Sequence, residues 1–171
     1  MDGIVGRLLD TLERLNLTED TLVIFTGDNG TSPGLTNRLG SFHLRGGKHT
    51  MNEAGTHVPF IVRWPSKFHS GKRTPFFTLM DVLPKIASIA KIPLQYKVNG
   101  MDLSHNFFNT DRIDRTMFAM AFEGDVYFVH DHRFRLHEDG QLYEIHVSSN
   151  KLRYNMEILD PSLHAENRQR L

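Results

Sequence analysis

The stretch TLVIFTGDNG, residues 21–30, carries the clearest signal of the fold class. Its first part, Leu22–Thr26, is short, continuously apolar and β-prone, which is the pattern of a strand buried on both faces in an α/β sheet. Asp28 and Asn29 follow at the carboxyl end of this predicted strand. Open α/β sheets bind their ligands at that end, because the loops that leave the strands there form a crevice.

A helix is predicted ahead of the strand. Apolar residues recur at helical spacing from Asp2 to Leu15, and charged residues occupy the other side, so this segment is predicted to form an amphipathic helix. Helix, short loop and buried strand make half of a β-α-β unit whose first strand is not in the sequence. We therefore expect the chain to be the back part of a larger domain with a parallel sheet.

The middle of the chain predicts a long loop, a strand and a second helix. Residues 27–55 contain seven glycines and many polar residues, and loops of that length in compact domains are usually functional or disordered. A strand is predicted over 57–64; Pro59 pairs poorly in a sheet, so the strand starts late or lies at an edge. A helix over 79–90 tolerates Pro84 in its first turn, and Asp81 suits its positive end.

The last third of the sequence, which follows a predicted linker over 91–115, has the pattern of an antiparallel sheet. Short β-prone runs occupy 116–122, 126–130, 134–137 and 141–145. Asp139-Gly140 between the last two is a strong two-residue hairpin signal. A terminal helix is predicted from Asp160 onward, capped by Asp160 or Ser162.

Composition excludes several classes of function. Twenty Lys and Arg residues balance twenty Asp and Glu residues, so no broad electrostatic case exists for nucleic acid or an anionic membrane. Zero cysteines exclude disulfides, thiolate metal sites and a cysteine-derived nucleophile within these residues. No apolar run approaches a membrane span, and the residues after Met1 do not begin a signal peptide.

Asp28 and Asn29 are candidate metal ligands. A carboxylate and an amide oxygen at adjacent positions suit a hard cation such as Ca²⁺ or Mg²⁺, which takes oxygen ligands. The alternative is that Asp28-Asn29-Gly30 is simply a turn, which these residues favour by themselves. Two ligands also cannot fill the positions around a calcium ion, so any others must come from elsewhere.

Lys48 is a candidate anion contact. Gly46 and Gly47 before it let the backbone approach an oxyanion, while the ammonium group supplies a compact positive charge. The alternative is a solvated lysine after a flexible turn. Arg45 and Glu53 in the same region are expected to hydrogen-bond the loop.

The order of the motifs resembles the second half of a type I sulfatase, in the alkaline-phosphatase-like superfamily. The motifs are TLVIFTGDNG at 21–30, LRGGK at 44–48, EAG at 53–55, VPFIVRWP at 58–65, DVLP at 81–84, NGMDL at 99–103, RFRL at 133–136 and LYEI at 142–145. The resemblance implies an α/β fold. Residues 1–110 would form the C-terminal part of the catalytic domain, and residues 111–171 a small antiparallel α+β subdomain.

The resemblance also implies roles for three residues. Asp28 and Asn29 would bind the divalent cation, usually calcium with magnesium as the alternative, and Lys48 would be the catalytic residue that contacts the sulfate. The family's nucleophile is a formylglycine made within a Cys/Ser-x-Pro-x-Arg motif, and no such motif occurs in these 171 residues. We expect it in a front half that is missing here.

The predicted function is therefore that of a sulfatase fragment, inactive alone, whose full enzyme hydrolyses aryl or carbohydrate sulfate esters. Export from the cytoplasm is what the resemblance implies for the compartment. A phosphate or phosphonate ester hydrolase of the same superfamily is the alternative enzyme, because it needs the same metal and oxyanion contacts. A non-catalytic remnant that acts as a binding fragment is the alternative of a different class.

Overall fold

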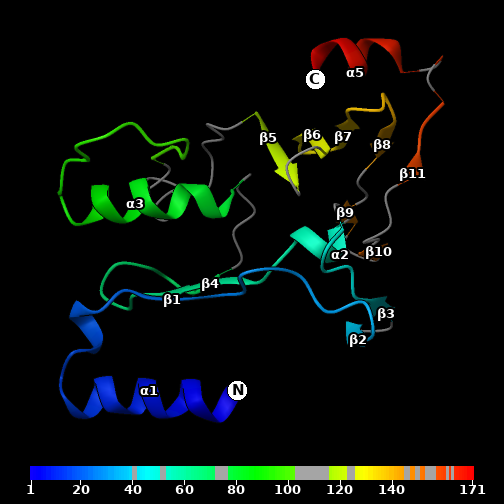
Figure 1. The fold of residues 1–171 in the computed structure, drawn as a ribbon. Coiled ribbons are helices and arrows are strands. Elements are labelled where there is room, and N and C mark those ends of the chain that lie inside the picture. Colours follow the sequence, from blue (N-terminus) through cyan, green and yellow to red (C-terminus); the bar gives the residue numbers. More distant parts are fainter. Residues whose placement is uncertain are drawn as a thin grey trace. The chain divides into compact units, whose positions relative to one another are not determined.

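The chain divides into two compact units (Figure 1). Unit 1 comprises Met1–Gly27 and Pro59–Arg112, and unit 2 comprises Asp28–Val58 and Ile113–Leu171. The computed structural model describes residues 1–39, 42–50, 53–71, 77–102, 116–122, 126–144, 147–148, 151–152, 157–160, 162 and 164–171. The domain division at residue 110 stays a prediction, and the grouping of Asp28–Val58 with the C-terminal strands is a feature that the sequence did not predict.

Unit 1 begins with the predicted amphipathic helix. Helix α1 spans Asp2–Arg14, and a short 3₁₀ turn, η1, spans Thr18–Asp20 before strand β1 at Val23–Thr26. Strand β4, Phe60–Arg63, starts directly after Pro59, which confirms the late start predicted for it. The two strands lie between α1 and a second helix, α3, at Val82–Ile89 (Figure 1).

The sequence did not predict that β1 pairs with β4. Within the described residues β1 pairs with β4 alone, and the pairing is antiparallel, with Val23 opposite Arg63 and Thr26 opposite Phe60. The first three residues of β1 are half-buried, and Ile61 on β4 is 58% exposed. In the described part of the chain this ribbon has no third strand, and the exposed Ile61 shows that its faces are only partly covered.

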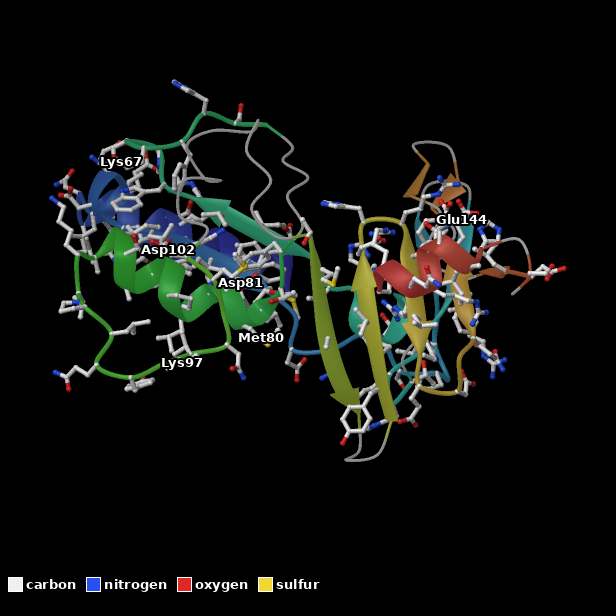
Figure 2. All side chains as sticks on the ribbon, turned by 90° about the horizontal axis from the view of Figure 1, so that it is seen from above. Lys67, Met80, Asp81, Lys97, Asp102 and Glu144 are labelled. Carbon is white, nitrogen blue, oxygen red and sulfur yellow. The ribbon has the colours of Figure 1, made fainter. Side chains whose placement is uncertain are left out.

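Helix α3 is the second predicted helix of unit 1. A 3₁₀ turn, η2, spans Leu79–Asp81, and α3 follows at Val82–Ile89 with Pro84 as its third residue, in the first turn as predicted. The buried Asp81 carboxylate accepts hydrogen bonds from the Thr78 amide at 2.9 Å and the Met101 amide at 2.8 Å. Figure 2 shows Asp81 and Met80 at the start of this helix. The carboxylate therefore fixes both the helix start and the segment that follows the helix.

Unit 2 contains a five-stranded antiparallel sheet in the order β11-β8-β7-β6-β5. Its strands are β5 at Met117–Phe122, β6 at Val126–Asp131, β7 at Phe134–His137, β8 at Leu142–Glu144 and β11 at Glu157–Ile158. A separate pair is formed by β9, Val147–Ser148, and β10, Lys151–Leu152. The hairpin predicted at Asp139-Gly140 is confirmed, because β7 pairs with β8, but its loop is longer than the two residues predicted: the His137 amide donates to the Gln141 carbonyl, which leaves residues 138–140 in the loop. Gly140 takes a φ of 79°, which glycine adopts without strain.

The terminal helix begins later than predicted. Helix α5 spans Ala165–Arg170, and its N-cap is His164, so Asp160 and Ser162 do not cap it. The Asp160 carboxylate instead accepts hydrogen bonds from the amide and hydroxyl of Ser162, which closes a local turn ahead of the helix.

Helix α5 packs on one face of the sheet. Arg170 forms an ion pair with Asp131, and the Arg168 guanidinium donates to the Gly140 carbonyl. Burial alone would raise the pKa of Asp131, but the amides of Phe134 and Arg133 and the Arg170 guanidinium hold that pKa below its usual value. The carboxylate is therefore well placed to anchor the helix.

The segment Asp28–Val58 belongs to unit 2 and lies on the other side of this sheet. It contains the paired strands β2, Thr36–Leu39, and β3, Phe42–Arg45, followed by the short helix α2 at Glu53–Thr56. In both views α5 lies on one side of the five-stranded sheet and this segment on the other (Figures 1 and 2). The predicted long loop is thus a small folded layer under the sheet.

Candidate functional site

All three predicted site residues lie in the segment Asp28–Val58. Asp28 and Asn29 form a bend two residues after the end of β1; Asp28 is exposed and Asn29 half-buried. Lys48 follows β3 by three residues and is half-buried. The prediction that the acid-amide pair follows the strand directly is therefore confirmed at the level of the backbone.

Backbone hydrogen bonds hold the two parts of the site together. The Lys48 amide donates to the Thr31 carbonyl at 2.9 Å, and the Gly30 amide donates to the Gly55 carbonyl at 2.9 Å. The stretch that begins with Asp28 and Asn29 therefore lies beside the lysine loop on one side and the end of α2 on the other. Residues 17 positions apart in sequence, Thr31 and Lys48, become direct neighbours.

Three glycines make this close approach possible. A Cβ atom added to Gly30 would overlap the Ala54 carbonyl, and one added to Gly46 would overlap the carbonyls of Thr31 and Ser32. A Cβ atom on Gly55 would overlap the carbonyls of Gly47 and Thr50. Only glycine lets these backbones pack so closely, which explains why glycine occupies these three positions of the predicted loop.

The lysine loop is itself a tight turn. Both the amide and the hydroxyl of Thr50 donate to the Gly47 carbonyl, at 2.9 and 2.6 Å. His49 takes a φ of 69°, a left-handed conformation that is uncommon for residues other than glycine. The backbone on both sides of Lys48 is therefore fixed.

Other predicted loop residues have local roles or lie outside the description. The Arg45 side chain donates to the Pro33 carbonyl at 3.4 Å, which confirms its predicted role in hydrogen-bonding the loop. The side chain of Glu53 lies outside what the structure describes, so its predicted role stays a prediction.

Asp28 and Asn29 fit a hard cation by their chemistry but cannot complete its coordination. Both offer oxygen atoms, the ligands that Ca²⁺ and Mg²⁺ take. Among the described side chains no cluster of three or more His, Cys, Asp or Glu residues could hold a metal ion. Two adjacent oxygen ligands supply a minority of the six to eight positions around calcium.

The sequence did not single out the buried polar residues that stabilise each unit. They include Lys85 in unit 1 and Arg135 in unit 2, which are 2% and 1% exposed. Charged residues are rarely buried, and their sequence surroundings carry no periodic signal that would reveal it.

Comparison with known proteins identifies the family. The family model described as Sulfatase matches residues 1–92. The chain belongs to the sulfatase family.

The chain is similar to several curated sulfatases. It is 37% identical to human arylsulfatase A over 117 residues, which cover 67% of this chain and 23% of the relative. Similarity to bovine arylsulfatase A extends over 98% of this chain at 30% identity, and covers 32% of that protein. It is 36% identical to an N-acetylgalactosamine-6-O-sulfatase from Bacteroides thetaiotaomicron over 55% of this chain and 20% of that protein. The chain thus spans between a fifth and a third of the length of these relatives.

Solved structures support the fold. A structure connected with the metabolism of multiple glycosaminoglycans by Bacteroides thetaiotaomicron aligns with 99% of this chain and 41% of its own, at a TM-score of 0.78 and 23% identity. A sulfatase from Pseudoalteromonas sp. aligns with 97% of this chain and 36% of its own, at a TM-score of 0.64 and 21% identity. The mixed α/β structure therefore matches part of the sulfatase fold. In the described part of the chain no helix is long and apolar enough to cross a membrane.

Proposed function

We propose that this chain carries part of the active site of a sulfuric ester hydrolase of the arylsulfatase type. Asp28 and Asn29 bind a divalent cation, and Lys48 contacts the sulfate group of the substrate. The observation that carries the proposal is the hydrogen bond from the Lys48 amide to the Thr31 carbonyl, because it places the lysine loop beside the acid-amide stretch. Membership of the sulfatase family supports sulfate esters over phosphate esters as substrates.

The cation is most consistent with calcium, with magnesium as the alternative. Asp28 supplies an anionic oxygen ligand and Asn29 a neutral one, and the remaining ligands come from residues other than this pair. When bound, such a cation supplies positive charge that stabilises the sulfate oxygens. Because the glycine-packed turn fixes the backbone at Gly30, the two ligands start from a defined position.

Lys48 stabilises negative charge on the substrate. Its ammonium group is a compact charge on a flexible stem, while hydrogen bonds at Gly47 and Thr31 hold its backbone. A cation placed where charge develops on the sulfate oxygens lowers the barrier to cleavage of the ester bond. Lys48 is therefore the catalytic residue that we assign to this chain.

The nucleophile and the substrate belong to the same proposal. Because no Cys/Ser-x-Pro-x-Arg motif occurs in residues 1–171, we expect this polypeptide alone to release no sulfate from an aryl sulfate. The formylglycine would be supplied by sulfatase polypeptide outside these residues. The names of the relatives support aryl or carbohydrate sulfate esters as the substrate class.

Binding measurements on the 171-residue chain test the proposed site. We expect Asp28→Asn to weaken calcium binding by about tenfold or more, because it removes the anionic ligand. Lys48→Met should weaken sulfate binding and leave calcium binding unchanged. Titration calorimetry with calcium chloride and with sodium sulfate measures both.

Two exposed residues provide matched controls. Asp10→Asn removes a carboxylate from α1, and Lys67→Met removes an exposed ammonium group (Figure 2), so neither should change either affinity. The proposal is wrong if the unsubstituted chain binds no calcium, or if Asp28→Asn binds it as tightly. Tighter binding of phosphate than of sulfate would favour the phosphate-ester alternative.

A further inference from the structure

The five-stranded sheet has an inner face that points away from α5. Antiparallel partners lie on the same face of a sheet, and successive residues alternate between faces. Phe128 lies opposite His137, His130 opposite Arg135, and Arg135 opposite Tyr143, so these five side chains share one face. We call this set the inner face.

Helix α5 contacts the opposite face. The centre of the His164 ring lies 6.2 Å from the centre of the Phe134 ring, and Arg170 forms an ion pair with Asp131. Phe134 precedes Arg135 directly, so the two side chains point to different sides of the sheet. Both figures show the segment Asp28–Val58 on the side of the sheet away from α5. Because the inner face points away from α5, it points to the side of this segment.

Arg135 is the most deeply buried cation among the described residues of the inner face. Its side chain is 1% exposed, and its guanidinium carbon lies 4.3 Å from the centre of the Phe128 ring. A guanidinium stays charged when buried, and it has five donors for neighbouring oxygen atoms. Burial is the main cause that lowers the pKa of His137, and the charge of Arg135 lowers this pKa further. The charge of Arg135 therefore acts on its neighbours on the inner face.

We propose that Arg135 is a positioning residue for the candidate site. Its buried guanidinium fastens the segment Asp28–Val58 to the sheet, and this keeps Asp28, Asn29 and Lys48 in place. The segment is rich in backbone carbonyls at tight turns, which are acceptors that a planar fork of N–H donors matches. Arg135 acts through the backbone of the segment and touches no substrate. The proposal rests on the proposed function for the identity of the site.

Hydrogen exchange of the site amides tests the proposal directly. The Gly30 and Lys48 amides are hydrogen-bonded within the segment, so their exchange rates report whether it stays in place. In the 171-residue chain we expect Arg135→Met to speed their exchange by about tenfold or more, while the amides of β6 and β7 keep their rates. Calcium affinity should fall by about tenfold, as for other residues that orient ligands indirectly.

Arg133 provides the matched control. It carries the same charge two residues earlier, its side chain is 66% exposed, and it pairs with Glu144. Arg133→Met should therefore leave both the site amides and calcium affinity unchanged. Arg135→Lys keeps the charge but loses the fork, so its effect on the two amides should be smaller than that of Arg135→Met.

The proposal is overturned if Arg135→Met leaves exchange at Gly30 and Lys48 unchanged, or if exchange in β6 and β7 rises equally. Should Arg135→Met fail to fold, Arg135→Lys decides by the same criterion. Exchange is measured without any ligand, so it tests Arg135 even if the unsubstituted chain binds no calcium. A failure of the unsubstituted chain to bind calcium would count against the proposed function instead.

Discussion

At the scale of single residues, Lys85 gives the protein a defined dependence of stability on pH. Its side chain is 2% exposed, and its ammonium nitrogen lies 4.5 Å from the centre of the Phe77 ring. Burial lowers its pKa from 10.5 to about 8, although the carboxylates of Asp81 and Asp102 oppose the shift. Between these two pH values the unfolded chain holds a proton that the folded chain has released. Raising the pH therefore favours the folded state in this window.

We predict that Lys85→Met removes this contribution. In the unsubstituted chain, Lys85 should make the free energy of unfolding rise above pH 8. Urea unfolding from pH 7.5 to 10.5 should show that this rise is absent from the variant. Lys97→Met removes an exposed ammonium group (Figure 2) and should keep the original pH dependence. If the free energy of unfolding changed with pH in the same way in Lys85→Met and in the unsubstituted chain, the buried amine would not titrate in this range.

At the scale of elements, helix α2 and the lysine loop depend on one glycine. Gly55 is buried where a Cβ atom would overlap the Gly47 and Thr50 carbonyls, and neither carbonyl is a flexible group. We predict that Gly55→Ala lowers the free energy of unfolding by about 1–3 kcal/mol through overpacking. Gly34→Ala, in the same segment with no atom within 4 Å, should have almost no effect. Equal unfolding midpoints in urea for the two variants would contradict the prediction.

Sequence patterns predicted the elements that have a strong local signal. The amphipathic period predicted α1, and Asp139-Gly140 predicted the β7–β8 hairpin. Strands β2 and β3 lie in a segment too rich in glycine and polar residues to show a period, so they were not predicted. The antiparallel β1–β4 pair was missed because a continuous apolar run fits a buried strand of either orientation.

At the scale of the whole molecule, the sequence predicted which residues form the candidate site but not how they are arranged in space. The motif order pointed to Asp28, Asn29 and Lys48, and the backbone contact between Thr31 and Lys48 brings their loops together. Arg135 could not be predicted in the same way, because its burial results from tertiary packing and not from a local sequence pattern. Tertiary contacts of this kind leave no periodic signal in the sequence.

The division into two units makes a prediction about how the molecule opens. The segment Asp28–Val58 lies between β1 and β4 in sequence but belongs to the unit that contains the C-terminal sheet. Cooperative unfolding units follow contacts, so we expect this segment to open together with the sheet. Native-state hydrogen exchange at increasing urea should give the Gly30 and Lys48 amides the same opening free energy as β6 and β7. If these two amides exchange together with those of β1 and β4 instead, the site belongs energetically to unit 1, and the sheet does not support it.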